Sequence, residues 1–285
     1  MEFSTLKIFS AVAESGSVSK AAAELHYVQS NVTARIQRLE EELGAQLFVR
    51  SRQGMTLTSA GEVLMEYASR ALRLAEEARA AVASTQGLAG TLRLGSLETT
   101  LAVRLPRALS DFHRQYKDVE LRIMTGTTDQ LVSAVLAFKV DGAFVAGQVS
   151  HPAVEQFPAF VEEVVLVTPP DVTDMHTWTT RTLIVFRQGC SYRALAEQWL
   201  RTTGITPVRL MELGTLDGIL ACVGAGLGVT LLPRSAVERH HLAASIGLHK
   251  LDEPYSEMTI GLIRHRDTPR HAGLNVFFEL TTAEG

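Results

Sequence analysis

The sequence predicts an α/β protein in which a small all-α module and one long helix precede an α/β body. Two helical patterns on either side of a tight turn occupy residues 18–43. A stretch rich in Ala, Leu, Glu and Arg, without proline, follows over residues 60–83 and favours continuous helix. From residue 91 onward, short β-branched segments alternate with helical patterns, which is typical of sheets covered by helices. The 285 residues are enough for a module and a body with its own core.

The N-terminal module has the layout of a winged helix-turn-helix with a basic wing. Three helices are predicted, each with apolar residues three or four positions apart and therefore one buried stripe. Ser17 is the predicted N-cap of the second helix, and the third begins at Ser30 after a tight connection over 26–29. Arg50 and Arg52 lie in the predicted wing. The predicted buried stripes are Phe3, Leu6, Phe9 and Val12; Val18, Ala21, Ala22 and Leu25; and Val32, Ile36, Leu39 and Leu43.

The exposed N-terminal half of the third predicted helix carries amides, hydroxyls and guanidinium groups but no carboxylate. Amides and guanidinium groups can pair with base edges, whereas hydroxyls, arginines and a helix N-terminus can hold phosphates. A merely solvated face is the alternative, but the tight turn before it and the arginines after it favour DNA. The predicted DNA-binding residues are Ser17, Gln29, Ser30, Asn31, Thr33, Arg35, Arg38, Arg50 and Arg52.

Net charge does not by itself indicate DNA binding, because residues 1–58 carry six Lys or Arg and six Glu. The basic character is local, which predicts a modest salt dependence of DNA binding. The chain start has no basic segment followed by an apolar one, and the longest uncharged stretch, 218–233, is too short to span a membrane. Cys190 and Cys222 are too few for a disulfide framework. These features predict a cytoplasmic protein.

Residues 59–88 are predicted to link the module to the body as a helix that also pairs with a second copy of the chain. Six apolar residues within it are spaced four and three positions apart, which is a heptad seam. The alternative is that this stripe packs on its own body. Pairing would place two recognition helices on successive major grooves and predicts an interrupted palindromic site. The seam residues are Leu64, Ala68, Ala71, Ala75, Ala78 and Val82.

Strands and helices alternate in the body, which begins after a glycine-containing break at 86–90. In open α/β sheets, ligands bind beyond the carboxyl ends of the strands, where helix N-termini offer free N–H groups. The predicted strands are 91–95, 119–124, 142–146, 164–168, 183–186, 208–212 and 228–232, and the predicted helices are 106–116, 130–138, 192–203, 217–224 and 234–240.

Hydroxyl-rich clusters follow several of these strands, and their convergence predicts one small-molecule site. Ordinary helix capping by Ser and Thr is the alternative. Glu98 and Asp129 could pair with a cationic ligand, or could instead favour a helix start through the dipole. The predicted effector-binding residues are Ser96, Glu98, Thr99, Thr100, Thr127, Thr128, Gly147, Cys190, Tyr192 and Thr215.

The N-terminal motif resembles that of the LysR-type bacterial transcriptional regulators almost position by position. One departure concerns base reading. Many members have a basic residue directly after the Ser or Thr of the recognition helix, where this chain has Ala34 followed by Arg35. The matching residues are Phe9, Val12, Gly16, Ser17, Ala21, Ala22, Leu25, Gln29, Ser30, Arg35, Ile36, Leu39, Glu40, Leu43, Gly44, Leu47, Phe48, Val49, Arg50, Leu57, Thr58, Ala60 and Gly61.

The resemblance implies a DNA-binding transcription factor that forms a homo-oligomer, a dimer or a tetramer, on double-stranded DNA. It also implies a small-molecule effector held by a two-lobed, periplasmic-binding-protein-like domain, with the chain crossing near Val167 and returning near Arg264 and with 270–280 closing the first lobe. The implied domains are 1–58 for DNA binding, 59–88 for linkage and dimerisation, and 89–285 for the effector, with lobe I at about 91–166 and 265–285 and lobe II at about 167–264.

Residues 94–98 and 189–193 are similar to segments of putrescine-utilisation regulators, and also to regulators associated with cation efflux. An amine or polyamine effector is therefore the working hypothesis. It is consistent with a carboxylate at Glu98.

Two alternative functions rest on other residues. Cys190 lies between Arg187 and Arg193, which could favour a redox-sensing thiolate. An α/β enzyme is the remote alternative, since 224–229 lacks the third glycine of a dinucleotide fingerprint and no nucleophile elbow or P-loop occurs. His240 and His241 are adjacent and lack the i, i+4 spacing of a helical metal pair. We therefore expect no catalytic residue, no metal and no cofactor.

Overall fold

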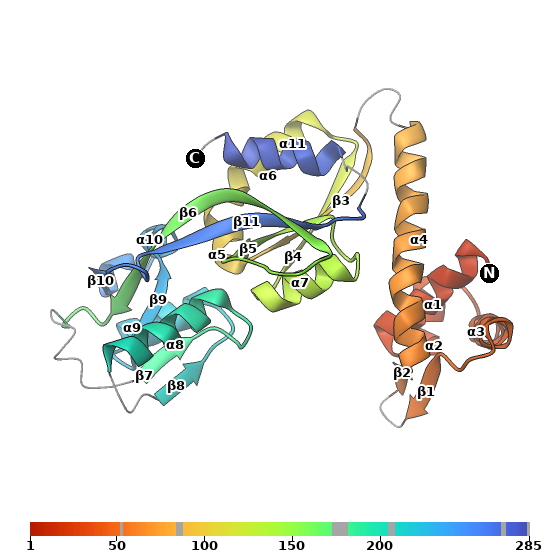
Figure 1. The fold of residues 1–285 in the computed structure, drawn as a ribbon, viewed down its shortest axis with the longest axis horizontal. Helices are drawn as coiled ribbons and strands as arrows, with labels where there is room; N and C mark the ends of the chain where they lie inside the picture. The colour runs from red at the N-terminus through yellow and green to blue at the C-terminus, as the bar shows by residue number, and fades with distance from the viewer. Residues whose placement is uncertain (52–53, 84–87, 173–181, 205–208, 269–271, 284–285) are drawn as a thin grey trace. The chain divides into compact units, whose positions relative to one another are not determined.

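The computed structural model describes residues 1–51, 54–83, 88–172, 182–204, 209–268 and 272–283 (Figure 1). The chain divides into two compact units. One is Met1–Gly90 with Ala137–Lys139, and the other is Thr91–Leu136 with Val140–Gly285. Among the helices of the described chain, none combines the length and the apolar composition that crossing a bilayer requires.

The first unit is the predicted winged helix-turn-helix followed by a long helix. Ser17 caps the second helix, since its Oγ accepts a hydrogen bond from the Lys20 N–H at 3.4 Å. The two wing strands pair antiparallel. Gly54 opens the second of them with a φ of 123°, and a Cβ there would lie 2.5 Å from the Gly16 carbonyl oxygen, so only glycine fits. The elements are α1 (Phe3–Ser15), α2 (Val18–Glu24), α3 (Gln29–Leu43), β1 (Phe48–Ser51), β2 (Gly54–Leu57) and α4 (Ser59–Ala83).

Nearly all of the predicted stripe residues lie in the core of this unit, where the Phe9 and Phe48 rings are 5.3 Å apart. Leu25 is only partly buried but packs against the core. The prediction was wrong for Phe3 and Leu43, which are 53% and 43% exposed. They are the first residue of α1 and the last of α3, where the helical period continues beyond the region in which the helices pack together.

Helix α4 does not present the predicted seam as one exposed surface. Leu64 and Ala68 are buried in the core of the N-terminal unit, and Ala71 packs against it. The first half of the stripe therefore packs on the N-terminal module, and neither the predicted pairing nor packing on the α/β body describes it. The far end differs, because Val82 is 77% exposed.

The second unit is built on a seven-stranded mixed sheet with the order β10-β6-β11-β5-β3-β4, in which β9 also pairs with β6. A separate two-stranded parallel sheet joins β7 and β8. The strands are β3 (Gly90–Ser96), β4 (Val119–Thr125), β5 (Gly142–Ala146), β6 (Val154–Thr168), β7 (Thr182–Val185), β8 (Arg209–Glu212), β9 (Thr230–Pro233), β10 (Gly247–Lys250) and β11 (Glu257–His265).

Helices cover both faces of the strands in the first lobe. Helices α6 and α11 lie together on one face and α7 lies on the opposite face (Figure 1), with Phe112 of α6 against Phe277 of α11. The helices of this unit are α5 (Glu98–Val103), α6 (Leu105–Gln115), α7 (Thr128–Leu136), α8 (Ser191–Thr203), α9 (Leu216–Gly224), α10 (Arg234–Glu238), the 3-10 turn η3 (Ala243–Ser245) and α11 (Ala272–Thr282).

Strand β6 connects the two lobes. Its first part, up to Glu163, pairs with β11, and its last part, Val164–Thr168, pairs with β9 and β10. The predicted crossing near Val167 lies in β6, and the predicted return near Arg264 lies in β11. The predicted two-lobed α/β architecture is therefore what the structure shows.

Candidate functional site

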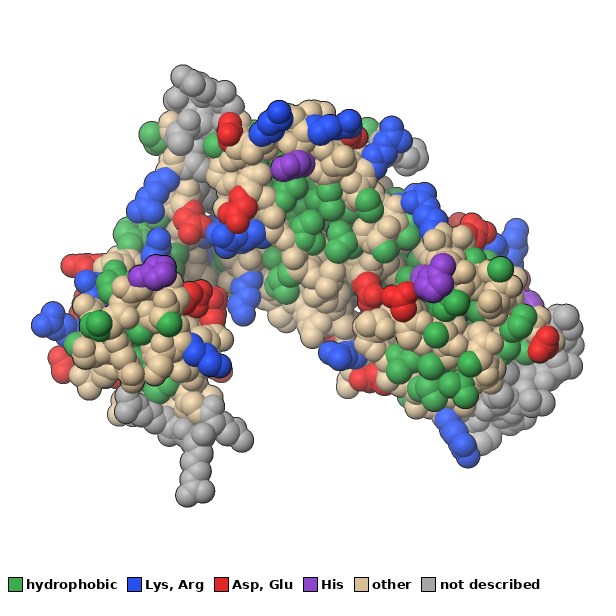
Figure 2. Space-filling model, turned by 180° about the vertical axis from the view of Figure 1, so that it is seen from behind, with side chains coloured by type: hydrophobic (Ala, Val, Ile, Leu, Met, Phe, Trp, Pro, Cys, Tyr) green, Lys and Arg blue, Asp and Glu red, His purple; other side chains and the backbone are tan. Residues whose placement is uncertain are grey.

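The first turn of α3 exposes Gln29, Ser30 and Asn31. The helix begins directly after Val28, whose extended backbone ends the tight turn. Amide and hydroxyl groups at a helix start are the groups that DNA-reading helices present to bases and phosphates. On the face shown in Figure 2, basic and acidic side chains intermix over the N-terminal unit, in keeping with its balanced charge.

Two of the predicted contact residues use their polar groups inside the module. Nη1 of Arg35 donates to the Ser4 Oγ at 2.8 Å and lies 3.8 Å from the Glu2 carboxylate, so the guanidinium faces α1. The Thr33 hydroxyl donates to the Gln29 carbonyl oxygen at 3.0 Å. Arg38 is exposed on α3.

The structure describes the two predicted wing arginines only in part. Arg50 lies in β1, opposite Met55, and its side chain is outside the described part of the structure. Arg52 lies outside the described residues.

Glu40 has a structural role that the sequence did not suggest. Its Oε1 accepts from the backbone N–H groups of Leu47 and Phe48 at 2.8 and 3.3 Å, which ties α3 to the wing.

The second unit contains a cavity of about 210 Å³ whose walls come from both lobes. Five of the predicted effector-binding residues line it, namely Glu98, Thr99, Thr127, Cys190 and Tyr192. The other lining residues, which were not among the predicted effector-binding residues, are Leu97, Thr125, Gly126, Gln130, Phe186, Arg187 and Gly214.

The other five predicted residues do not line this cavity. Three of them form hydrogen bonds with other residues of the cavity walls. The buried Ser96 hydroxyl donates to the Leu97 carbonyl oxygen, and the Thr128 hydroxyl lies 2.9 Å from the Ser191 Oγ. Thr215 caps α9 by accepting from the Gly218 N–H. Helix capping, the alternative interpretation, therefore describes Thr215. The remaining two are Thr100, which is buried, and Gly147, which has a φ of 79°.

Opposite charges line the cavity. The Glu98 carboxylate accepts a hydrogen bond from the Leu216 N–H of α9 at 3.2 Å. Arg187 follows β7 and is exposed, and its guanidinium has no carboxylate partner among the described residues. A Cβ at Gly214 would lie 3.2 Å from the Arg187 Nη2, so the glycine leaves room for the guanidinium. Arg187 directly follows the predicted strand 183–186, so the rule of strand ends applies to it as well.

Tyr192 is buried at the cavity wall, and its hydroxyl has no hydrogen-bond partner in the described part of the chain. Burial, followed by the negative charge of Glu162, raises the pKa of this phenol well above its ordinary value. The hydroxyl therefore stays protonated and could donate to a ligand. An unmade hydrogen bond on a buried hydroxyl is costly, so a polar ligand atom there would be favoured.

Cys190 has the environment of a thiol, not that of a thiolate. Burial raises the pKa of its sulfhydryl, and this outweighs the hydrogen bonds and the Arg193 charge that lower it. The Arg193 guanidinium bonds instead to Glu197 and Glu212, at 2.7 and 2.6 Å. Because redox sensing requires an accessible thiolate, the structure disfavours the redox alternative.

A half-buried ion pair ties the two lobes together next to Tyr192. Nε of Arg104 donates to one Glu162 oxygen at 2.6 Å, and the Ser235 hydroxyl donates to the other at 2.6 Å. Glu162 lies in β6, Arg104 joins α5 to α6, and Ser235 lies in α10. The Arg104 guanidinium also stacks 5.1 Å from the Phe160 ring centroid.

A winged helix-turn-helix joined by a long helix to a two-lobed domain with a polar cavity defines a class of protein, the ligand-responsive DNA-binding regulators. Residues 3–62 match the family model described as "Bacterial regulatory helix-turn-helix protein, lysR family", and residues 85–285 match the model "LysR substrate binding domain". The chain belongs to the LysR family of bacterial transcriptional regulators.

Relatives of known sequence match along nearly the whole chain. An uncharacterized HTH-type transcriptional regulator, YusT of Bacillus subtilis (strain 168), is 43% identical over 99% of this chain and 96% of its own. GltR of the same organism is 42% identical over 97% and 95% of the two chains, and CzcR of Bacillus anthracis is 41% identical over 94% and 92%.

Solved structures share the fold. A full-length OxyR variant from Pseudomonas aeruginosa superposes with a TM-score of 0.77 at 23% identity, covering 99% of this chain and 94% of its own. Full-length CbnR complexed with its target DNA gives a TM-score of 0.69 at 24% identity, covering both chains fully. LysG from Corynebacterium glutamicum with bound effector Arg gives 0.65 at 19%, covering 99% and 98%.

Proposed function

We propose that this LysR-family regulator binds its promoter DNA through the start of α3 and the wing. In this proposal the protein acts in the cytoplasm, where the bacterial chromosome lies, and has no enzymatic activity. The observation that carries the proposal is the polar first turn of α3, which exposes Gln29, Ser30 and Asn31 beside a two-stranded wing. In this proposal these side chains read bases, and Arg38, the start of α2 at Ser17, and Arg50 and Arg52 hold phosphates.

Arg35 has a different role in this proposal from the one predicted. Because its guanidinium bonds to Ser4 and lies near Glu2, it orients the recognition helix on α1. The departure at Ala34 fits this role, since neither residue then supplies a basic group at the family's usual base-reading position. In this proposal the side-chain amides of Gln29 and Asn31 therefore read the DNA sequence.

We propose that the cavity binds a small effector that carries both an ammonium and an acidic group. Glu98 favours a cation, as the amine hypothesis requires, whereas Asp129 does not line the cavity. Arg187 lines the same cavity and is not paired with a carboxylate among the described residues, which favours an anionic group on the same ligand. An amino acid satisfies both charges. A diamine such as putrescine would leave the arginine unsatisfied.

Titration calorimetry with three matched sets of small molecules tests this effector class. We expect amino acids to bind at least about tenfold more tightly than amines without a carboxylate and carboxylates without an amine, because each truncation removes a hydrogen bond between charged groups. Tight binding of diamines alone would restore the polyamine hypothesis and overturn the proposed class. Binding of carboxylates alone would mean that Arg187, and not Glu98, supplies the charge that recognises the ligand.

We propose that two copies pair through the outward face of α4. Val63, Tyr67 and Leu74 are 58%, 61% and 59% exposed, and their spacing of four and seven positions places them along one side of the helix. This stripe is rotated around the helix from the predicted seam, whose first half is buried. An exposed apolar stripe on a long helix is typical of a helix–helix contact between subunits.

Replacing Leu74 with glutamate is expected to dissociate the oligomer, because it buries an unpaired charge in the proposed contact. Light scattering coupled to size exclusion measures the mass directly. The matched control is Arg79→Glu, which places the same charge at an exposed position on another side of α4. If Leu74→Glu and Tyr67→Glu both keep the wild-type mass, the α4 contact is wrong.

Ligand control of DNA binding would follow from the two-lobed cavity. A ligand that contacts both lobes favours the relative lobe orientation in which it makes more contacts, and only this difference in affinity can shift the equilibrium. In the proposed oligomer, α4 would carry the change to the spacing of the recognition helices on DNA.

A further inference from the structure

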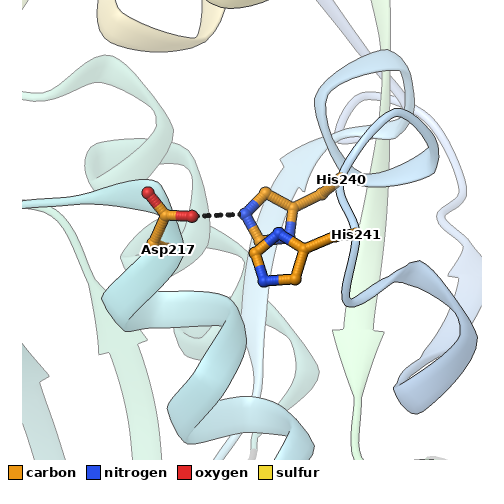
Figure 3. Close-up of side chains that lie close together, drawn as sticks. All are labelled: Asp217, His240 and His241. Atoms are coloured by element: carbon orange, nitrogen blue, oxygen red, sulfur yellow. Dashed lines mark hydrogen bonds and ion pairs between the residues drawn. The ribbon is translucent and has the colours of Figure 1, made fainter.

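Three side chains from two separate segments of the second unit meet at its surface (Figure 3). Asp217 lies in the first turn of α9, and His240 and His241 follow α10. An oxygen of Asp217 lies 2.7 Å from Nε2 of His240, and the two imidazole centroids are 4.3 Å apart. One ligand atom from each residue lies within 4.8 Å of the other two.

We propose that Asp217, His240 and His241 bind a divalent transition-metal ion, with Zn²⁺ as the first candidate. Imidazole nitrogen and carboxylate oxygen bind Zn²⁺ at about 2.0–2.2 Å, which sets tetrahedral ligand atoms about 3.4 Å apart. The Asp217–His240 separation of 2.7 Å is below that value and the other separations are at most 4.8 Å, so the proposed site would close by small side-chain rotations. Three protein ligands leave one position for water. Two nitrogen ligands disfavour Mg²⁺ and Ca²⁺, which prefer oxygen.

His240 is the least exposed member of the set. Its side chain is 11% exposed, compared with 74% for Asp217, and its Nδ1 accepts from the Leu242 N–H at 3.2 Å. In the tautomer that fits both contacts, Nε2 carries the proton and donates to Asp217. When a metal ion takes the place of this proton, the proton moves to Nδ1 and the contact with the Leu242 N–H opens.

His241 supplies the adjustable ligand. It is exposed and makes no hydrogen bond within the described residues, so its ring can turn toward the ion. The sequence argued against a metal here because adjacent histidines lack helical i, i+4 spacing. The fold adds a third ligand from α9, more than twenty positions away in the sequence, which a search by spacing could not find.

The proposed metal site is separate from the effector cavity, because none of its three residues lines that cavity. It is nevertheless adjacent to it. Asp217 follows Leu216, whose N–H donates to Glu98, and Gly214 lines the cavity. A bound ion would join the start of α9 to the end of α10 and so restrain the helix start that holds Glu98.

Metal titration of the untagged full-length protein, first stripped with a chelator, tests the site without any effector. We expect one Zn²⁺ per chain and a rise in Tm on Zn²⁺ addition, because ligand binding to the folded state stabilises it. Co²⁺ should give visible absorption without the intense near-ultraviolet thiolate band. That band would place the ion at a cysteine and overturn the proposal, as would the absence of Zn²⁺ binding.

Variants assign the ligands. His241→Ala and Asp217→Asn should each lower Zn²⁺ affinity by at least about tenfold, since loss of even an outer-shell partner costs that much. Both residues are exposed, and the metal-free Tm of each variant verifies folding. The control is His113→Ala, an exposed histidine in the last turn of α6, which should bind Zn²⁺ as the wild type does. Wild-type affinity in both ligand variants would contradict the assignment.

Discussion

Replacing Gln29 with alanine is expected to weaken specific DNA binding by about 1–3 kcal/mol, because the side chain amide pairs with a base edge in the proposed complex. Gln29 is the first residue of α3, is exposed, and is not part of the hydrophobic core, so its replacement should leave the core unchanged. Binding to unrelated DNA and the slope of affinity against salt should stay unchanged, because the amide is neutral. Fluorescence anisotropy with specific and scrambled duplexes measures both quantities.

Gln37→Ala is the matched control, since Gln37 is an exposed amide on the same helix but eight positions further along. It should leave specific affinity within a few tenths of a kcal/mol of wild type. Equal losses for the two variants would mean that α3 reads DNA along another face. Arg38→Ala should instead weaken specific and scrambled duplexes alike and reduce the salt slope by about one.

Replacing Glu98 with glutamine is expected to lower effector affinity by about 1.5–3 kcal/mol, the range for hydrogen bonds to charged groups. Glutamine keeps an oxygen that can accept from the Leu216 N–H, so the start of α9 should stay in place. The change therefore removes the charge and little else. Calorimetry with the best amino acid from the three-set screen measures the loss.

Asp129→Asn is the control for Glu98→Gln, because Asp129 is an exposed carboxylate at the start of α7 that does not line the cavity. It should bind the effector as the wild type does. By linkage, Glu98→Gln should also reduce the effect of the ligand on DNA affinity, while affinity without ligand is kept. Equal effects of the two variants on effector binding would place the amine-binding group elsewhere.

The N-terminal half was predictable because its signals are local. Helix periodicity, the Ser17 cap and the tight turn depend on neighbours within a few positions, and they predicted the presence of α1 and the bounds of α2, α3 and α4 to within a residue or two of those observed. The exceptions are the helix ends at Phe3 and Leu43. There the period is correct but no facing element covers the side chain.

Strand β6 shows why the body was harder to predict. Only 164–168 was predicted as strand, because Pro158 and the glutamates at 155, 162 and 163 interrupt the apolar pattern before it. In the structure the strand begins at Val154, and Pro158 sits opposite Gly261 at a register shift with β11. Strands β10 and β11 and helix α5 were not predicted at all.

Residues of the cavity illustrate a second limit of sequence reasoning. The rule of strand ends selected Glu98, Thr99 and Thr127, which line the cavity, but it could not separate hydroxyls that face the cavity from those that bond within its walls, such as Ser96. The direction of a side chain depends on tertiary packing. Arg187 was considered only as a neighbour of Cys190, because its place in the cavity wall depends on how the segment after β7 packs.

Footprinting of the full-length protein on the region upstream of its own gene, with and without the amino acid that binds most tightly, tests the central claim most directly. We predict protection of two half-sites separated by about one helical turn or a multiple of it, and a change in the protected spacing when the ligand is added. Protection that is absent, or identical with and without a ligand that calorimetry shows to bind, would contradict the proposed coupling between the cavity and the recognition helices.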